Sequence, residues 1–189
     1  VWISWSDGGL QSHSYSVPSS SQTVTAYYKT QYYLTMQANP TGGGAVSPSS
    51  GWRDAGSGFY IQATASSGYV FSSWSGSGTG SYTGSSNPAT VSMNAPITET
   101  ANFLVIVTVS SDPLGISSVK VDETVITTPY SFAWIAGSTH KLEALSPVPG
   151  ASGVQYAWVS WSDGGSQTHT YTTPSSSQTV TANYKTQYY

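Results

Sequence analysis

The 189-residue sequence contains no cysteine, which excludes disulfide bridges and thiolate metal sites. Charged side chains are scarce, at 7% of the residues against about 25% in an average protein. The five Lys and Arg residues are scattered and form no basic patch, so we expect neither nucleic acid nor an anionic membrane as a partner. No signal peptide is visible, and no apolar run approaches the roughly 18 residues that a membrane span needs.

Aromatic residues are abundant by contrast, at 13% of the chain with 14 Tyr and 7 Trp. A Gly-, Ser- and Pro-rich chain with few charges would otherwise be typical of disorder. Each buried aromatic side chain removes roughly 150–250 Å² from water, which suffices to stabilise small β-modules. A cysteine-free chain with little Lys and much Ser, Thr, Tyr and Gly indicates an exported microbial surface protein, extracellular or at the cell surface.

A long internal repeat dominates the sequence. Residues 2–9 recur closely as 158–165, residues 18–26 recur unchanged as 174–182, and residues 29–33 recur unchanged as 185–189. Such close copying indicates a tandem array. Because the sequence begins at Val1 in the middle of the pattern, we expect it to be part of a longer mature chain with further copies on either side.

A weaker repeat lies inside this period. Residues 69–75 resemble 156–162, residues 98–103 resemble 179–184, and residues 34–40 resemble 107–113. We therefore predict four segments. They are the C-terminal part of a preceding module (1–30), module one (31–103), module two (104–186) and the start of the next repeat (187–189).

The local pattern is that of β-strands. Apolar residues alternate with polar ones over residues 34–38, 105–109, 119–121 and 179–184, as expected for half-buried strands. Gly- and Pro-containing turns separate these runs, and no segment keeps a helical period. The sequence thus predicts an all-β chain of tandem, small β-sandwich or β-barrel-like modules, with a Gly-rich bend over residues 76–84.

Two family resemblances follow from these motifs. A first strand, an aromatic strand ending in Trp-Ser-Gly and a Thr-x-Thr-Ala-Asn-Phe strand resemble the divergent repeats related to the listerial internalin B-repeat. The residues that carry this pattern are Tyr69, Phe71, Trp74, Ser75, Gly76 and 98–103. The resemblance covers module one and the second half of module two. It implies an extracellular spacer, stalk or adhesive role and no catalytic residues.

The first half of module two resembles a PEGA-type surface module instead. The residues that carry this second pattern are 107–109, 112–115, 119–122, 128–129 and 137–140. The sequence departs from it at Glu123, where a glycine is expected after Asp122.

The sequence contains residues that catalytic and metal sites use, but in patterns that favour neither. His13 and His169 occupy equivalent repeat positions near Asp7 and Asp163, but no Gly-x-Ser-x-Gly elbow accompanies them, so we expect solvent-facing histidines and no enzyme. Residues 7–9 and 163–165 would each give calcium one carboxylate plus carbonyls, whereas calcium takes six to eight oxygens. Asp-Gly as a turn is the alternative. We expect no cofactor.

The aromatic residues have two interpretations: exposed rings would stack on sugars, whereas buried rings would form the core. Recurrence of Trp5, Trp74 and Trp161 at one motif position favours the core. The pairs Tyr32-Tyr33 and Tyr188-Tyr189 are assigned to module joints or to lateral contacts between chains.

Exposed loops are predicted after two prolines, as candidate O-glycosylation sites. Their serines are Ser19, Ser20, Ser21, Ser175, Ser176 and Ser177. An intramolecular isopeptide bond from Lys29 or Lys185 to a nearby Asn or Asp is a further hypothesis for a surface stalk.

The function favoured by the sequence is a structural repeat of an extracellular fibre, stalk or surface layer. Its partners are other copies of the repeat, in the same chain or in neighbouring chains, including strand donation to residues 1–30. The alternative is an adhesin or carbohydrate-binding accessory module with a glycan partner.

Overall fold

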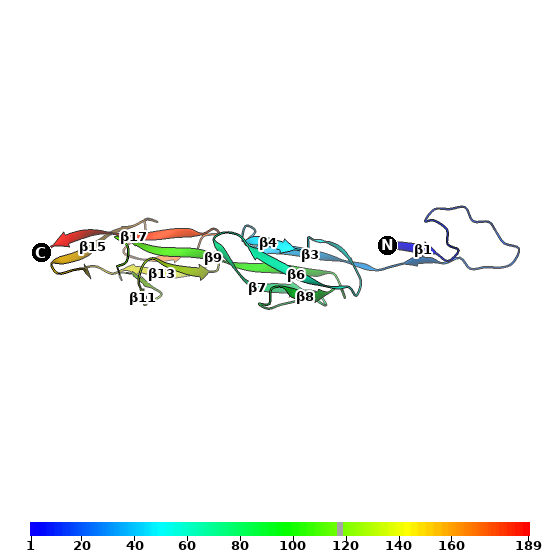
Figure 1. Ribbon diagram of the computed structural model, residues 1–189, viewed down its shortest axis with the longest axis horizontal. Coiled ribbons are helices and arrows are strands. Elements are labelled where there is room, and N and C mark those ends of the chain that lie inside the picture. Colours follow the sequence, from blue (N-terminus) through cyan, green and yellow to red (C-terminus); the bar gives the residue numbers. More distant parts are fainter. Residues whose placement is uncertain (117–118) are drawn as a thin grey trace. The chain divides into compact units, whose positions relative to one another are not determined.

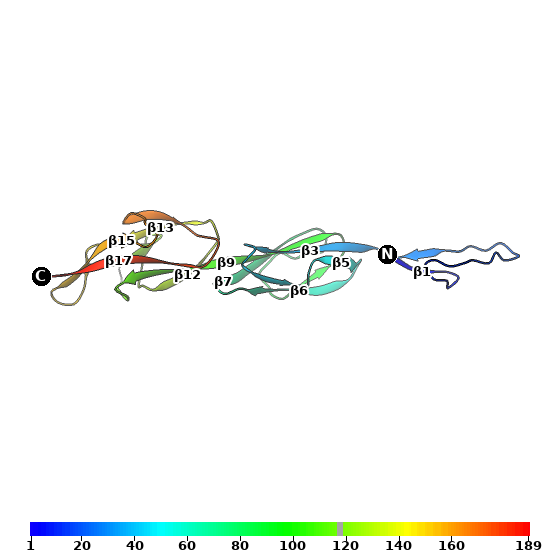
Figure 2. The same cartoon turned by 90° about the horizontal axis from the view of Figure 1, so that it is seen from above.

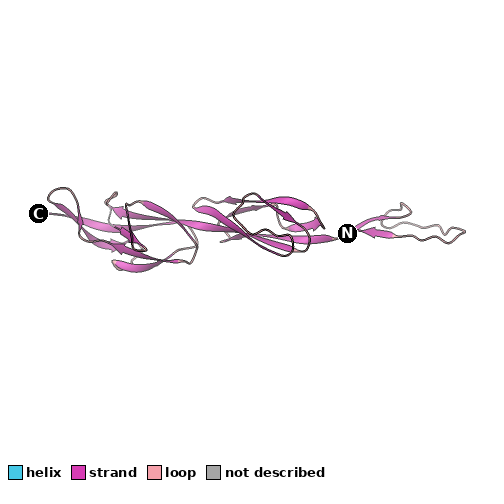
Figure 3. Ribbon diagram, turned by 90° about the horizontal axis from the view of Figure 1, so that it is seen from below, coloured by secondary structure: helices cyan, strands magenta, loops and turns pink. Residues whose placement is uncertain are grey.

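The structure is a computed structural model that describes residues 1–116 and 119–189 (Figure 1). Within these two ranges the chain forms strands, turns and loops and no helix (Figure 3). This confirms the predicted all-β class with sandwich-like modules. The absence of any apolar helix in the described residues also means that none of them forms a membrane-spanning helix.

The described residues cluster into two units of mutually contacting segments. Unit 1 comprises residues 1–37, 46–62 and 74–100, and unit 2 comprises residues 38–45, 63–73 and 101–189. Several strands contribute residues to both units: β3 (Gln31–Asn39), β4 (Gly44–Ser47), β6 (Gly58–Ala65), β7 (Tyr69–Ser77) and β9 (Ile97–Asp112). The module boundaries drawn from the repeat stay a prediction.

Unit 1 contains a short hairpin-like ladder and a packed β-module. Strands β1 (Trp2–Trp5) and β2 (Ala26–Tyr28) pair antiparallel as a two-stranded sheet. Elsewhere β5 (Gly51–Asp54) pairs with β3, and β8 (Ala89–Ser92) pairs with β6. The buried residues of this module share an apolar character and come from strands or, for Met93, from the residue that follows β8: Leu34, Met36, Ile61, Trp74, Val91, Met93 and Ile97.

Unit 2 is a two-sheet sandwich built around β9. One sheet runs β14-β15-β17-β9, with β12 also paired to β9, and the other runs β11-β10-β13-β16. The strands are β10 (Val119–Val121), β11 (Thr124–Ile126), β12 (Tyr130–Trp134), β13 (Thr139–Ala144), β14 (Val148–Pro149), β15 (Val154–Trp161), β16 (Thr168–Thr172) and β17 (Gln178–Tyr188). Strands β9 and β17 lie side by side and parallel, as Figures 1 and 2 both show.

The core of unit 2 follows from period-two patterning. Val105, Val107 and Val109 on β9 are all fully buried, while the residues between them are only half-buried. The second sheet contributes Val119, Val121 and Leu142 to the same cluster. Alternate side chains of a strand point to one face, so each of these runs fills one side of the space between the two sheets.

Candidate functional site

The repeated Trp-Ser-Asp-Gly-Gly motif folds into a hydrogen-bonded corner after β15. The Gly164 N–H donates to the Trp161 carbonyl (3.1 Å), and Asp163 Oδ1 accepts from the Gly165 N–H (3.0 Å). The His169 ring lies edge-on to Trp161, with Nε2 3.1 Å from Asp163 Oδ2 and Nδ1 2.9 Å from the Ser166 carbonyl oxygen. The Asp-Gly sequence therefore forms a turn that a histidine closes.

The N-terminal copy of the motif builds the same corner. Asp7 Oδ1 accepts from the Gly9 N–H at 3.0 Å, and His13 Nε2 lies 2.9 Å from Asp7 Oδ2. His13 Nδ1 lies 2.7 Å from the Leu10 carbonyl oxygen. Because both ring nitrogens face acceptors, a doubly protonated ring satisfies both contacts, and the hydrogen bond to the Asp7 carboxylate raises the pKa of His13.

The contacts of the two Asp-His pairs can be compared with those that a catalytic triad or a calcium site requires. Each histidine uses its second ring nitrogen on a backbone carbonyl and not on a serine hydroxyl. Each aspartate has one oxygen on a glycine N–H and the other on histidine. The described residues contain no group of three His, Asp or Glu side chains arranged to hold a metal ion.

A third histidine forms a Ser-His-Asp line that the sequence motifs did not indicate. Asp122 Oδ2 lies 2.7 Å from His140 Nδ1, and His140 Nε2 lies 3.0 Å from Ser138 Oγ. The His140 ring stacks on Trp134, with ring centroids 3.8 Å apart and planes at 11°. The hydrogen bond from His140 lowers the pKa of the Asp122 carboxyl.

The surroundings of this line favour a structural role. An acyl-transfer site needs backbone donors directed at the developing oxyanion. The Ser138 N–H donates to the Ile135 carbonyl (3.0 Å), and the Gly137 N–H donates to the Thr173 carbonyl (2.8 Å). The Ser138 hydroxyl also lies 3.1 Å from Thr173 Oγ1. The line thus ties β13 to the β10–β11 turn and to the end of β16.

Glu99 is a buried carboxyl group on β9, in unit 1. Its side chain is fully buried, and Oε1 accepts from the Tyr82 N–H at 2.6 Å. Oε2 has no hydrogen-bond partner among the described residues. Burial raises the pKa of the Glu99 carboxyl above its ordinary value of 4.5. The sequence offered one signal for this position, since Glu99 aligns with buried Val180 in the weaker repeat.

We expect the Glu99→Gln variant to stabilise unit 1 at pH 7.5 by about 1–2 kcal/mol, because the amide keeps the Tyr82 contact without a charge. The folded carboxyl binds its proton more tightly than the unfolded one, so wild-type stability rises as pH falls through the raised folded pKa. The advantage of the variant should shrink accordingly. Urea unfolding of both proteins at pH 5 and 7.5 measures this.

The exposed Glu123 supplies the matched control. Lys141 Nζ lies 2.7 Å from Glu123 Oε1 and lowers the pKa of that carboxyl. Its contribution is present above the unfolded pKa and is lost in acid, so Glu123→Gln should give no advantage at pH 7.5. A Glu99→Gln effect that does not change between the two pH values would contradict the assignment.

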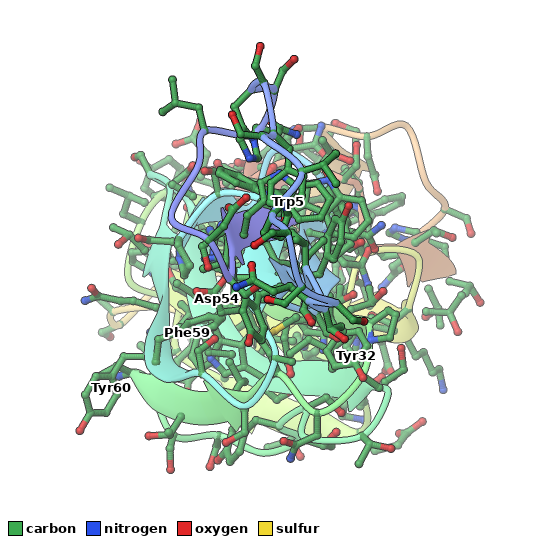
Figure 4. The ribbon with its side chains drawn as sticks, turned by 90° about the vertical axis from the view of Figure 1, so that its right-hand side faces the viewer. Trp5, Tyr32, Asp54, Phe59 and Tyr60 are labelled. Atoms are coloured by element: carbon green, nitrogen blue, oxygen red, sulfur yellow. The ribbon has the colours of Figure 1, made fainter. Side chains whose placement is uncertain are left out.

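A surface groove in unit 1 combines exposed aromatic rings with polar groups. Trp52 is 63% exposed and Tyr60 is 71% exposed, and both line the groove. Asp54 lies beside them and binds Lys29 Nζ at 2.8 Å and Gln31 Nε2 at 2.7 Å. Figure 4 shows Tyr60 pointing away from the ribbon, while Asp54 and Phe59 lie over it. Exposed rings of this kind would offer an apolar face to a sugar ring.

The predicted core and joint aromatics have different surroundings. Trp74 and Trp161 are buried, whereas Trp5 is half-buried. Tyr32 is half-buried, and Tyr33 packs edge-on against Trp52 at 5.4 Å.

At the other end of the chain Tyr188 and Tyr189 are exposed. The serines of both predicted O-glycan loops are exposed as well: Ser19, Ser20, Ser21, Ser175, Ser176 and Ser177. Lys29 binds Asp54, as described above, so its amine is held in an ion pair.

The all-β modules and the repeat define the class of protein as a modular β-repeat chain. In the comparison with protein families, residues 34–107 match the family described as the divergent InlB B-repeat domain. Repeats of this family are typically surface-associated in bacteria. Searches of curated proteins and of solved structures found no match.

The match confirms the internalin-type resemblance for nearly all of module one. It ends at residue 107, so the PEGA-like first half of module two stays a prediction. At the departure from this pattern, Asp122 and Glu123 have φ angles of 46° and 68°. This left-handed region favours glycine, the residue that the PEGA pattern has at this position.

Proposed function

We propose that this chain is a non-catalytic structural repeat of an extracellular fibre, stalk or surface layer. The observation that carries the proposal is the near-identical repeat, whose two copies build the same Asp-His corner. The repeated residues form a turn, the hydrogen bonds that close this turn, and one face of a strand. A periodic assembly requires this kind of repetition, whereas a single binding pocket does not.

The composition supports an extracellular location. The described chain relies on strand pairing, buried aromatics and Ser/Thr hydrogen bonds, with few charges and no disulfides. The family match to residues 34–107 points in the same direction. The engaged N–H groups around Ser138 support the non-catalytic part of the proposal.

The test is electron microscopy of covalent concatemers that contain one, two and three copies of the repeat. We expect rods whose length grows by a constant increment for each added copy, because each module contacts its neighbours only. Native material should show the same axial spacing. Flexible, unevenly spaced beads in both samples would argue against a fibre or stalk.

A second candidate function rests on the groove at Trp52 and Tyr60. Its exposed rings and polar rim favour carbohydrate binding by an adhesin or accessory module. A glycan array decides between the two functions, with the Trp52→Ala variant as the control. Binding that this variant abolishes would support the second function, and an array without hits would leave the structural one.

A further inference from the structure

Residues 157–186 are the covered copy of the repeat. Strand β17 pairs in parallel with β9, from Gln178 opposite Val107 to Asn183 opposite Asp112. Strand β16 pairs antiparallel with β13. Five side chains of the segment enter the core of unit 2 as a result, with exposed fractions of 9% or less: Trp161, Tyr171, Val180, Ala182 and Tyr184.

Residues 1–30 are the uncovered copy. In the described part of the chain this segment forms only the two-stranded β1–β2 sheet. Tyr15 is 43% exposed where Tyr171 is 5% exposed, and Tyr28 is 69% exposed where Tyr184 is 9% exposed. Val24, the equivalent of buried Val180, is only half-buried.

The uncovered copy nevertheless keeps the backbone frame of the covered one. The Ser6 N–H donates to the Thr25 carbonyl, and the Thr25 N–H donates to Ser6 Oγ, both at 2.9 Å. The equivalent pair, Ser162 and Thr181, has the same two distances. The segment is therefore preorganised. The covered copy differs in having β9 and β13 paired with its outer edges.

We propose that residues 1–30 can take the place of residues 157–186 on β9 and β13 of a second copy of this chain when that copy's own segment is released. This inference rests on the proposed structural function and names the joint between copies. The second copy is the occupant because the covered copy shows that β9 and β13 fit this sequence. Strand addition to a sheet edge supplies backbone hydrogen bonds, and the buried side chains supply specificity.

The docked segment would bring the same core side chains, because Trp5, Tyr15, Val24, Ala26 and Tyr28 stand at the equivalent positions. Differences include Tyr27 in place of Asn183, which lies opposite Asp112, and Val17 in place of Thr173. The contact between Thr173 Oγ1 and Ser138 Oγ (3.1 Å) would be lost, while Ser138 would keep His140 Nε2. In the wild-type chain the tethered segment 157–186 competes at an effective concentration on the order of millimolar, so a wild-type monomer keeps its own segment.

The experiment displaces residues 157–186 from β9 and β13 in the full chain. Val180→Asp places a carboxylate among β9 side chains and should free the chain's own C-terminal copy. Residues 1–30 of a neighbouring molecule then fill the vacated edge, which leaves a new edge open. Such head-to-tail contacts do not close, so sedimentation should show a ladder of two, three and more chains and a several-fold rise in average mass.

The matched variant is Val24→Asp/Val180→Asp, which carries the same charge in the donor segment. It should remain a single chain, and Val24→Asp alone should behave as wild type. A synthetic peptide of residues 1–30 in excess should convert the Val180→Asp ladder to single chains, whereas the Val24→Asp peptide should not.

Two results would overturn the proposal. One is a Val180→Asp chain that stays single. The other is a double variant that associates as strongly as Val180→Asp, since that association would come from a disrupted core and not from residues 1–30. Either failure leaves the concatemer test of the stalk function standing, because copies there are joined covalently.

Discussion

Replacing Gly80 by alanine is expected to destabilise unit 1 by about 2–4 kcal/mol. Gly80 has a φ of +97°, and a Cβ there would lie 1.9 Å from the Ser92 carbonyl oxygen. The Ser92 N–H donates to the Gly80 carbonyl at 2.9 Å. The loop after β7 is therefore held against the end of β8 at a distance that only glycine permits.

Gly56 separates the steric clash from the backbone preference. It has a φ of +76°, but no atom lies within 4 Å of where its Cβ would stand. Gly56→Ala should thus cost only about 1 kcal/mol, from the left-handed conformation. Hydrogen exchange of the β8 amides, together with urea unfolding, measures both variants. Equal losses would mean that the loop shifts away from Ser92 at little cost.

The fold could be predicted because its signals are local. The alternation over residues 105–109 places Val105, Val107 and Val109 on one face, and these three side chains are fully buried. The Gly-rich bend was predicted from composition, and Gly78 and Gly80 both have positive φ angles. Strand periodicity and turn chemistry are properties of a few neighbouring residues.

The candidate sites were harder to predict because their partners are distant in sequence. Ser138 directly precedes β13 and His140 lies on that strand, but the aspartate that completes the line is Asp122, on the preceding hairpin. Glu99 shares the alternation of buried β9 residues, but a charged side chain is normally predicted to be exposed, so its burial was not expected from the sequence. Nothing in the sequence placed Trp52 beside Tyr60, because pairing of β5 with β3 and of β6 with β8 sets their positions.

The repeat also shows what sequence alone does not determine. Residues 22–25 and 178–181 have the same sequence, yet only the second stretch is a strand. Its parallel partner β9 supplies backbone hydrogen-bond donors and acceptors as well as an apolar surface. Strand formation depends on such pairing more than on intrinsic preference.

Trp161 and Trp5 stand at equivalent positions of the covered and uncovered copies, and alanine substitutions at these positions should have very different effects on stability. Both indole N–H groups donate to a glutamine carbonyl at 3.2 Å, Gln167 for Trp161 and Gln11 for Trp5. Trp161 is 2% exposed within the core of unit 2, whereas Trp5 is half-buried at the surface of the uncovered copy. Trp161→Ala should destabilise unit 2 by about 3–5 kcal/mol through the cavity it leaves. Trp5→Ala should change the stability of unit 1 by less than about 1 kcal/mol.

Calorimetry and urea unfolding of the two variants, at a concentration where the chain is monomeric, provide the comparison. Trp161→Phe keeps most of the ring volume and should recover much of the loss, which distinguishes a cavity from a chain that fails to fold. Comparable losses for Trp161→Ala and Trp5→Ala would show that the corner itself carries the stability. A much larger loss of stability for Trp161→Ala would show instead that Trp161 stabilises the fold through its burial in the core that includes β9 and β13. The motif around both tryptophans is the same, so the motif cannot cause the difference.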